Sequence, residues 1–209
     1  MINIIDIQSG NVRTWVKLFE RLLVPYRVVE APNELDSNTI LLPGVGSAGY
    51  FMEKMKSKGF FKVIKKYKEN KLRIIGICLG FQLLTEFTEE DGGIKGLGLI
   101  KGHTEKLKKA HIEFSNNGWS NINIRKDEIL HHSFLGSQKL TKKFIVNGRV
   151  FFNHEYGVKL KKTSGKHFFI NKNNASNYVA AFFSKNLIGI QFHPEKSQKT
   201  GVELIKLIL

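Results

Sequence analysis

The first ninety residues alternate short apolar runs with segments whose apolar residues recur at helical spacing. The runs have strand length and are rich in β-branched residues, and they cover Ile2–Ile7, Tyr26–Val29, Thr39–Leu42 and Leu72–Ile77. Alternation of strand and helix predicts an α/β fold with a doubly wound, mostly parallel central sheet and helices on both faces. In such sheets the working site lies at the carboxyl ends of the strands.

Helices are expected after the first, third and fourth of these strands. Asn11 is a fair N-cap for the first helix, and Pro25 lies beyond its end because proline cannot continue a helix. The apolar residues that recur every three or four positions lie in Val12–Leu23, Phe51–Ile64 and Phe81–Phe87.

The second half of the chain contains short apolar segments without clear helices between them, which favours an antiparallel extension of the sheet. The expected strands are Leu99–Gly102, Asn121–Ile124, Arg149–Phe152, His167–Ile170, Tyr178–Phe183 and Leu187–Phe192. A closing helix is expected over Val202–Leu209. The length of 209 residues and the lack of an internal repeat predict one domain, residues 1–209.

Composition narrows the class of protein. There are 33 Lys and Arg against 18 Asp and Glu, a net charge of +15, but the basic residues are scattered and lack interleaved aromatics. This favours a solvated lysine-rich surface over a nucleic-acid binder, and a basic face for an acidic partner protein is a third interpretation. A single cysteine excludes an internal disulfide framework and predicts a reducing, cytoplasmic location. No signal peptide or membrane span is expected, because Met1–Asp6 lacks a basic region and no apolar run approaches about 18 residues.

Cys78 lies where the fourth strand turns into a helix, with Gly76 and Gly80 two residues to either side. This is the layout of a nucleophile elbow with sulfur in place of oxygen. The glycines permit the sharp turn, and the start of a helix favours a thiolate over a thiol. The alternative is a buried structural thiol, which a lone cysteine often is.

A thiolate nucleophile needs a base and a group that orients the base. His193 and Glu195 follow the end of a β-run, and two positions along extended backbone can point the same way. Glu195 could then hold one ring nitrogen while the other faces Cys78. His154, within Asn153–Tyr156, competes for the same role, and spacing alone does not decide between them.

Pro43–Gly46 is a glycine-rich turn at the end of the third strand. Its backbone N–H groups could stabilise the oxyanion of a tetrahedral intermediate. A phosphate loop is disfavoured because no Gly-Lys-Ser/Thr follows, and a plain tight turn is the remaining alternative. No set of His, Cys, Asp and Glu has zinc-ligand spacing, so no metal or other cofactor is expected.

Together these motifs resemble the class I glutamine amidotransferases of the Cys-His-Glu triad type. The three motifs are Pro43–Gly46, Gly76–Gln82 and Gln191–Ser197. The run that continues through Lys196-Ser197 is most similar to the glutaminase subunit of imidazole glycerol phosphate synthase, and the resemblance extends over nearly the whole chain.

The resemblance implies a mechanism. Cys78 attacks the side-chain amide of glutamine, His193 shuttles the proton and Glu195 orients the imidazole. The N–H groups of Leu79 and Gly46 form the oxyanion hole. The residues implied to bind glutamine are Gly44, Gln82, Glu90, His154, Glu155 and Tyr156.

The resemblance also implies a heterodimer. Ammonia passes to a (β/α)8-barrel synthase subunit, which makes imidazole glycerol phosphate in histidine biosynthesis. A barrel has its active site at one face, so the glutaminase docks at the opposite end. The residues implied to lie at this interface are Gly10, Asn11, Trp119 and Lys196.

Several positions depart from the family pattern. The chain has Ile-Gln-Ser-Gly-Asn over residues 7–11, including Gln8-Ser9, where the family usually has Tyr-Gly-x-Gly-Asn. Ser115-Asn116 replaces Pro-His, Ser120 replaces Asn, and Glu155 replaces Ser or Thr. The triad is untouched, but several changes are expected near the docking surface.

These departures leave the partner open. The alternative is a paralogous subunit that supplies ammonia to a different synthase, such as one that makes amidino groups on surface sugars. A different cysteine hydrolase and a catalytically silent binding subunit are hypotheses from other classes.

Overall fold

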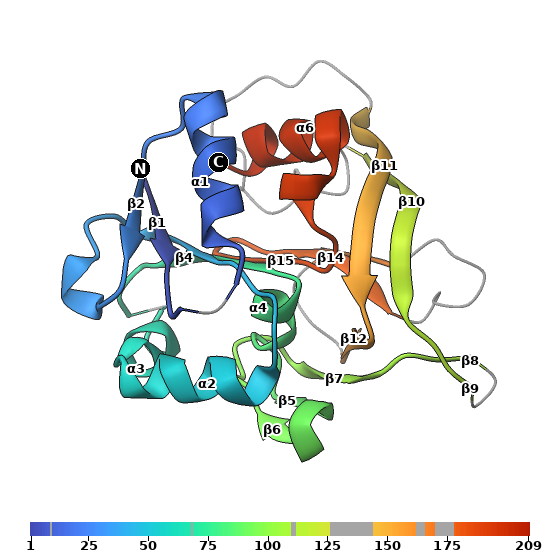
Figure 1. The fold of residues 1–209 in the computed structure, drawn as a ribbon, viewed down its shortest axis with the longest axis horizontal. Helices are drawn as coiled ribbons and strands as arrows, with labels where there is room; N and C mark the ends of the chain where they lie inside the picture. The colour runs from blue at the N-terminus through green and yellow to red at the C-terminus, as the bar shows by residue number, and fades with distance from the viewer. Residues whose placement is uncertain (9, 68, 110–111, 126–143, 162–165, 170–177) are drawn as a thin grey trace.

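The computed structural model describes residues 1–8, 10–67, 69–109, 112–125, 144–161, 166–169 and 178–209 (Figure 1). Ser9 and Ile170, which belong to segments named above, lie outside the described residues. Within the described part the main sheet has seven strands in the order β13-β14-β15-β4-β3-β1-β2. Their bounds are Ile2–Ile5 (β1), Tyr26–Val29 (β2), Thr39–Leu42 (β3), Arg73–Ile77 (β4), Lys166–Phe169 (β13), Val179–Phe183 (β14) and Leu187–Ile190 (β15).

The sheet is parallel from β15 through β4, β3 and β1 to β2, while β14 and β13 extend it in the antiparallel sense. Helices α1 (Val12–Leu22) and α6 (Gln198–Ile208) cover one face, and α2 (Ala48–Ser57) and α3 (Phe60–Lys65) cover the other (Figure 1). The expected α/β fold class is confirmed. None of the helices in the described ranges is long and apolar enough to cross a membrane.

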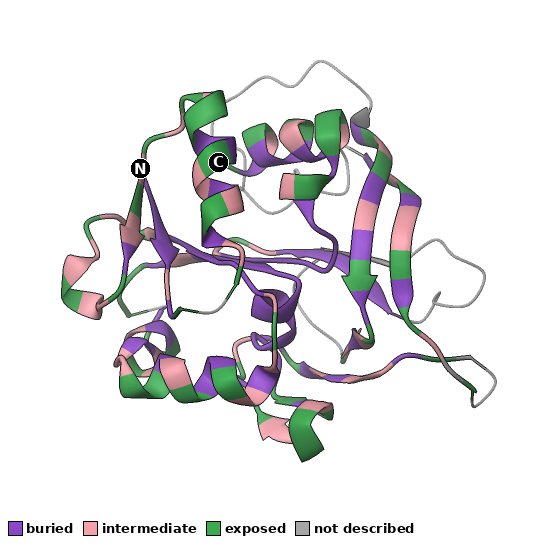
Figure 2. Cartoon of the chain, in the orientation of Figure 1, coloured by how far each residue is buried: buried purple, intermediate pink, exposed green. Residues whose placement is uncertain are grey.

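The sheet separates two hydrophobic clusters, because successive side chains of a strand point to opposite faces. Ile75 and Ile77 of β4 pack in the cluster under α1 and α6, and Ile74 packs in the cluster under α2 and α3. All three are fully buried, as are the central strands around them (Figure 2). Burial of each such side chain contributes about 1.5–3 kcal/mol, which holds β4 and the residue that follows it in place.

The second half departs from the expected single extension. A separate four-stranded sheet in the order β12-β7-β5-β6 lies beside the main one, and β10 pairs with β11 as a two-stranded ribbon. The remaining short pair joins β8 to β9. The bounds are Phe87–Thr88 (β5), Ile94–Lys95 (β6), Gly102–Lys106 (β7), Lys108–Lys109 (β8), Ile112–Glu113 (β9), Asn116–Arg125 (β10), Phe144–His154 (β11) and Tyr156–Leu160 (β12).

Two expected elements are wrong. The helix after Cys78 is short: α4 covers only Leu79–Gln82, and Phe87 lies on β5 with 43% of its surface exposed. The strand expected over Leu99–Gly102 begins only at Gly102. One cause explains both, because N–H groups of the loop that precedes Gly102 bond to carbonyl groups just beyond α4, as in the bond from Leu97 N to Leu83 O at 2.8 Å. Those carbonyls are then not available to continue the helix.

Candidate functional site

Cys78 forms a strained turn between β4 and α4. Its backbone has φ 50° and ψ −109°, a conformation that L-residues rarely adopt and that is typical of a nucleophile elbow. Its N–H donates to the carbonyl of Ile190 at 2.7 Å, which ties the elbow to β15. A Cβ on Gly80 would lie 2.2 Å from the carbonyl oxygen of Leu42, so only glycine permits this close approach to β3.

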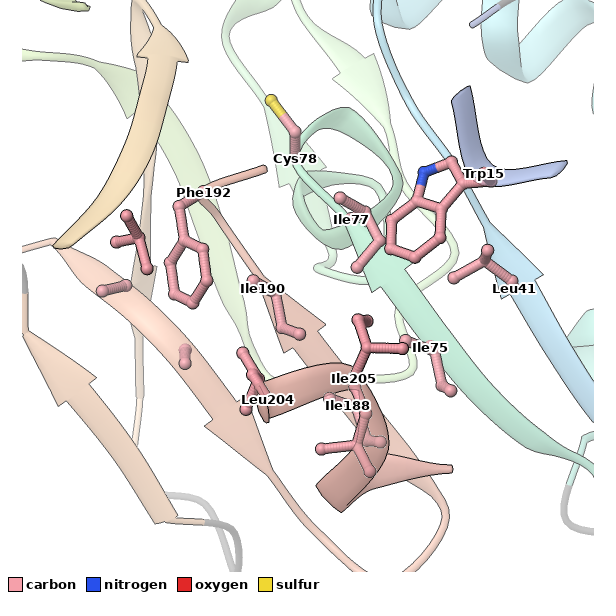
Figure 3. Packing of buried hydrophobic residues seen from close by; sticks show 14 of the residues in the cluster. Trp15, Leu41, Ile75, Ile77, Cys78, Ile188, Ile190, Phe192, Leu204 and Ile205 are labelled. Carbon is pink, nitrogen blue, oxygen red and sulfur yellow. The ribbon is translucent and has the colours of Figure 1, made fainter. Parts of the chain in front are cut away.

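The sulfur of Cys78 faces a cavity. The residue is 7% exposed and borders the apolar cluster, but its sulfur points away from Ile77 and Trp15 (Figure 3). It opens into a cavity of ≈ 340 Å³ whose lining includes Gly46, Cys78, Leu79, Gln82, Glu90 and Tyr156. The thiol can therefore contact a small molecule in the cavity. A structural cysteine sealed in the core could not do so.

His193 and Glu195 follow β15 and lie beside this sulfur. The Nδ1 of His193 is 2.7 Å from Oε1 of Glu195, and both side chains are buried. The loop is held by the His193 N–H, which donates to the Phe151 carbonyl at 2.8 Å, and by Ser197, whose hydroxyl donates to the His193 carbonyl at 2.6 Å. Glu195 thus sets the tautomer of the imidazole and leaves Nε2 for the sulfur side.

His154 is not arranged as a base. Its Nδ1 is 2.7 Å from the Tyr156 carbonyl, which can only accept, and its Nε2 is 3.0 Å from the side-chain nitrogen of Asn116, which can only donate. The ring is therefore a neutral imidazole with its proton on Nδ1. Both ring nitrogens are occupied, which favours His193 over His154 as the base.

The electrostatics of His193 reflect its neighbours. Burial lowers the pKa of the imidazole, but hydrogen bonding to Cys78 and Glu195 and their negative charges outweigh burial and raise this pKa to about 10. Within the described part of the chain, Nε2 makes no regular hydrogen bond, so the sulfur of Cys78 is its polar neighbour in the site. The imidazole beside the sulfur is therefore protonated at neutral pH.

Asn11 is part of this arrangement in a way that the sequence did not indicate. Its side chain does not cap α1, contrary to expectation. Instead its Nδ2 donates to Oε1 of Glu195 at 2.5 Å, the same oxygen that faces His193. The neighbouring Gly10 is exposed, and a Cβ there would lie 3.7 Å from the Pro43 carbonyl oxygen. The loop before α1 therefore lies against both the carboxylate and the glycine-rich turn.

The glycine-rich turn packs directly on the elbow. A Cβ on Gly44 would lie 2.4 Å from the backbone nitrogen of Gly80, so glycine is required at this contact. Gly46 has φ 113°, in the region that favours glycine, and it lines the cavity together with Leu79. The two residues predicted for the oxyanion hole therefore line the same cavity as Cys78.

Glu90 and Asp91 are two adjacent acids near the N-terminus of α2, and Glu90 lines the cavity. Asp91 accepts from the Ser47 hydroxyl at 2.6 Å and from the Gly49 N–H at 2.8 Å, and these bonds lower the pKa of its carboxyl. Glu90 behaves in the opposite way. Burial raises its pKa to about 7, with further contributions from the charges of Asp91 and Glu155. The sequence did not single out Asp91, which anchors the segment that carries Glu90.

Residues 154–156, which the family resemblance implies to bind glutamine, form a corner between two strands. His154 ends β11, Glu155 is exposed, and Tyr156 begins β12 of another sheet. All three line the cavity. Gln82 also lines it, but its Nε2 donates to the Tyr156 carbonyl at 2.7 Å, so its Oε1 is the atom left for a ligand.

Trp119 and Lys196, which are also predicted at a partner interface, lie near the segment that carries His193 and Glu195. The ring of Trp119 packs edge-on against Phe151 at 5.8 Å between centroids, and the ammonium of Lys196 lies 5.8 Å from the centre of the Phe151 ring. Arg149 lies over Trp119 at 5.7 Å. Cations on aromatic faces form an ordered surface next to Glu195. Within the described ranges, no group of three His, Cys, Asp or Glu could hold a metal ion.

The model of the family "Glutamine amidotransferase class-I" matches residues 3–208. A relative from Bacillus subtilis, "Imidazole glycerol phosphate synthase subunit HisH", is 31% identical over 98% of this chain and 93% of its own length. A relative of the same name from Buchnera aphidicola is 35% identical over 84% of this chain and 81% of its own length. A solved structure described as a glutamine amidotransferase has a TM-score of 0.69 at 14% identity and covers 100% of this chain and 96% of its own chain, which shows a shared fold.

Proposed function

The chain belongs to the class I glutamine amidotransferase family, and on that premise we propose that it is the glutaminase subunit of an imidazole glycerol phosphate synthase. The whole chain, residues 1–209, acts as one amidotransferase domain that hydrolyses glutamine and delivers ammonia for histidine biosynthesis. The observation that carries the proposal is the hydrogen-bonded pair of His193 and Glu195 beside the sulfur of Cys78 at the wall of a cavity.

The chemistry begins from the thiolate–imidazolium pair. The Cys78 thiolate attacks the side-chain carbonyl carbon of glutamine, and the negative charge moves to the carbonyl oxygen. Backbone N–H groups of Leu79 and Gly46, two residues that line the cavity, then stabilise that charge. Collapse of the intermediate breaks the C–N bond, and the proton of His193 leaves with the amine as ammonia. A thioester and a neutral imidazole remain.

Hydrolysis restores the enzyme. The neutral His193 takes a proton from water, which attacks the thioester carbonyl. The C–S bond then breaks, glutamate is released, and the thiolate returns beside the imidazolium. Glu195 holds Nδ1 through both steps at 2.7 Å and favours the positive charge on the ring.

Glutamine recognition is assigned to the opposite end of the cavity. The carboxylate of Glu90 pairs with the α-ammonium group of glutamine, and Gln82 Oε1 accepts from a donor of the substrate. His154 and Tyr156 line the walls around them, and Glu155 adds negative charge at the rim. Gly44 does not line the cavity and acts through its packing on the elbow.

A partner is expected because the relatives named above are subunits of a synthase. A (β/α)8-barrel synthase subunit would dock over Gly10, Asn11, Trp119 and Lys196, which surround the loop of the triad. The net charge of +15 fits an acidic face on that barrel. A cysteine nucleophile must stay reduced, which supports a cytoplasmic location.

The test is an isotope-transfer assay with the barrel subunit of the same organism. Glutamine carrying ¹⁵N in its side-chain amide should yield glutamate and place the label in imidazole glycerol phosphate. Cys78→Ala should abolish both products, while added ammonium salts should still support synthesis. Glutamate release without label in the imidazole product would overturn the assigned pathway, and an active Cys78→Ala variant would overturn the mechanism.

A further inference from the structure

Gln191 is a fully buried amide that the mechanism above does not use. It follows β15 directly, and its backbone N–H donates to the Ala180 carbonyl at 2.9 Å, so its position is fixed by the main sheet. Its side-chain Nε2 lies 3.7 Å from the sulfur of Cys78, and its Oε1 lies 3.3 Å from Nε2 of Gln82. A buried amide between two residues of the site is a candidate for a role in the reaction.

The orientation of this amide follows from its neighbours. The Tyr156 carbonyl can only accept, so the group of Gln82 that lies 2.7 Å from it is the NH₂. That same NH₂ can only donate to its next neighbour, so the atom of Gln191 that faces it at 3.3 Å is the oxygen. The nitrogen of Gln191 must then face the sulfur. The assignment of both amides is set by one backbone carbonyl.

The sulfur therefore has two polar neighbours with opposite preferences, besides His193. The Asn153 carbonyl, 3.9 Å from the sulfur, can only accept and so favours the thiol. The N–H of Gln191 can only donate, and a donor is stronger toward an anion than toward a neutral group. Burial of the amide keeps water from replacing this donor.

We propose that Gln191 is a positioning residue that donates an N–H to the Cys78 thiolate, and that Gln82 and the Tyr156 carbonyl hold this donor in place. The inference rests on the proposed function, because it assigns the nucleophile to Cys78. It connects the first residue of β12, at the glutamine end of the cavity, to the sulfur through two amides. Gln82 thereby serves the nucleophile as well as the substrate.

The test measures the rate at which iodoacetamide alkylates Cys78 in the full-length chain as a function of pH. Gln191→Met keeps the length of the side chain and removes the donor. Loss of one hydrogen bond to a charged group should move the midpoint of the pH profile upward by about one unit and slow alkylation about tenfold at pH values below both midpoints. Asn3→Leu is the matched control. Asn3 lies on β1, its side-chain amide is fully buried, and it donates to the Ser37 carbonyl at 2.8 Å. Its profile should stay within about twofold of the parent's.

A second variant tests the orientation. Gln82→Met leaves Gln191 in place without its anchor, so the midpoint should move in the same direction by a smaller amount. The double variant should show no larger shift than Gln191→Met alone, because both changes act on one hydrogen bond. A parental profile in Gln191→Met, or additive shifts in the double variant, would overturn the inference. If Gln191→Met does not fold, an unchanged profile in Gln82→Met overturns it.

The same samples separate this inference from the proposed function. Glutamate release that survives Cys78→Ala would remove the nucleophile and with it both proposals. Release that requires Cys78, together with alkylation that ignores Gln191, would remove the role of Gln191 alone.

Discussion

The unusual carboxyl of Glu90 leads to a pH dependence of glutamine binding. Burial and the charges of Asp91 and Glu155 raise the pKa of Glu90 from 4.5 to about 7. Near pH 7, about half of the molecules without glutamine therefore carry a protonated Glu90. Only the ionised carboxylate can pair with the α-ammonium group of glutamine, so we expect binding to strengthen as the pH rises through 7.

The magnitude follows from that pKa. If only the carboxylate form binds, the KM for glutamine should exceed its high-pH limit about elevenfold at pH 6 and about twofold at pH 7. At pH 8 the excess should be about one tenth. Glu155→Gln removes one of the charges that raise the pKa of Glu90, so the rise in KM should move to lower pH.

The assay is glutamate release by the complex with the barrel subunit, with KM and kcat determined separately between pH 5.5 and 8.5. Glu53→Gln is the control, because Glu53 is an exposed carboxylate on α2 that does not contribute to the pKa of Glu90. His193 titrates near pH 10 and should not affect this range. A KM that stays constant from pH 6 to 8, or a profile that Glu155→Gln does not move, would refute the assignment of Glu90 to the ammonium group.

Two further predictions concern the elbow and the triad. Gly80→Ala places a Cβ 2.2 Å from the Leu42 carbonyl oxygen, so it should cost about 3 kcal/mol and lower Tm by about 8 °C in thermal denaturation. Gly92→Asn, where a Cβ meets open space and only the φ of +79° is unfavourable, should cost about 1 kcal/mol, and equal effects of the two would contradict the packing argument. Glu195→Gln removes a charge and hydrogen bond that raise the pKa of His193, so NMR titration should show that pKa falling below about 10. An unchanged midpoint would mean that Glu195 does not hold the ring.

The parallel half of the fold could be predicted because its signal is local. Strands buried on both faces are written as continuous apolar runs, and Arg73–Ile77 and Thr39–Leu42 have this form. The second small sheet has no such signal. Gly102–Lys106 is mostly polar, and its partners in Tyr156–Leu160 lie 50 to 58 positions away. The early end of α4 also has no local signal. The carbonyl groups that would continue the helix accept hydrogen bonds from the loop around Leu97 instead.

The candidate site shows the same division. Cys78 and the pair of His193 and Glu195 could be proposed because each stands at the end of an apolar run with its own local signature. The choice against His154 needed the contact with Asn116, which comes from a neighbouring strand. The orientation of Gln191 needed a chain of contacts through Gln82, 109 positions away. Sequence spacing carries no information on such contacts.

The departures from the family pattern can now be placed on the structure, and two of them bear on the choice of partner. Asn116 and Ser120 are both buried. They share the inner face of β10, because side chains alternate along a strand, and Trp119 points to the opposite face. The face that carries Trp119 is therefore not the face that changed.

The chemistry of these two positions supports the same reading. The amide of Asn116 donates to His154 Nε2 at 3.0 Å, a bond that a ring N–H of histidine could also make, so the neutral tautomer of His154 and its bond to the Tyr156 carbonyl are preserved. The Ser120 hydroxyl is buried without a hydrogen-bond partner in the described part of the chain. Burial of this unpaired group should lower the stability of the β10–β11 ribbon. Neither change alters a group on the outer surface. The substitutions on β10 thus give no ground for a partner other than the one proposed above.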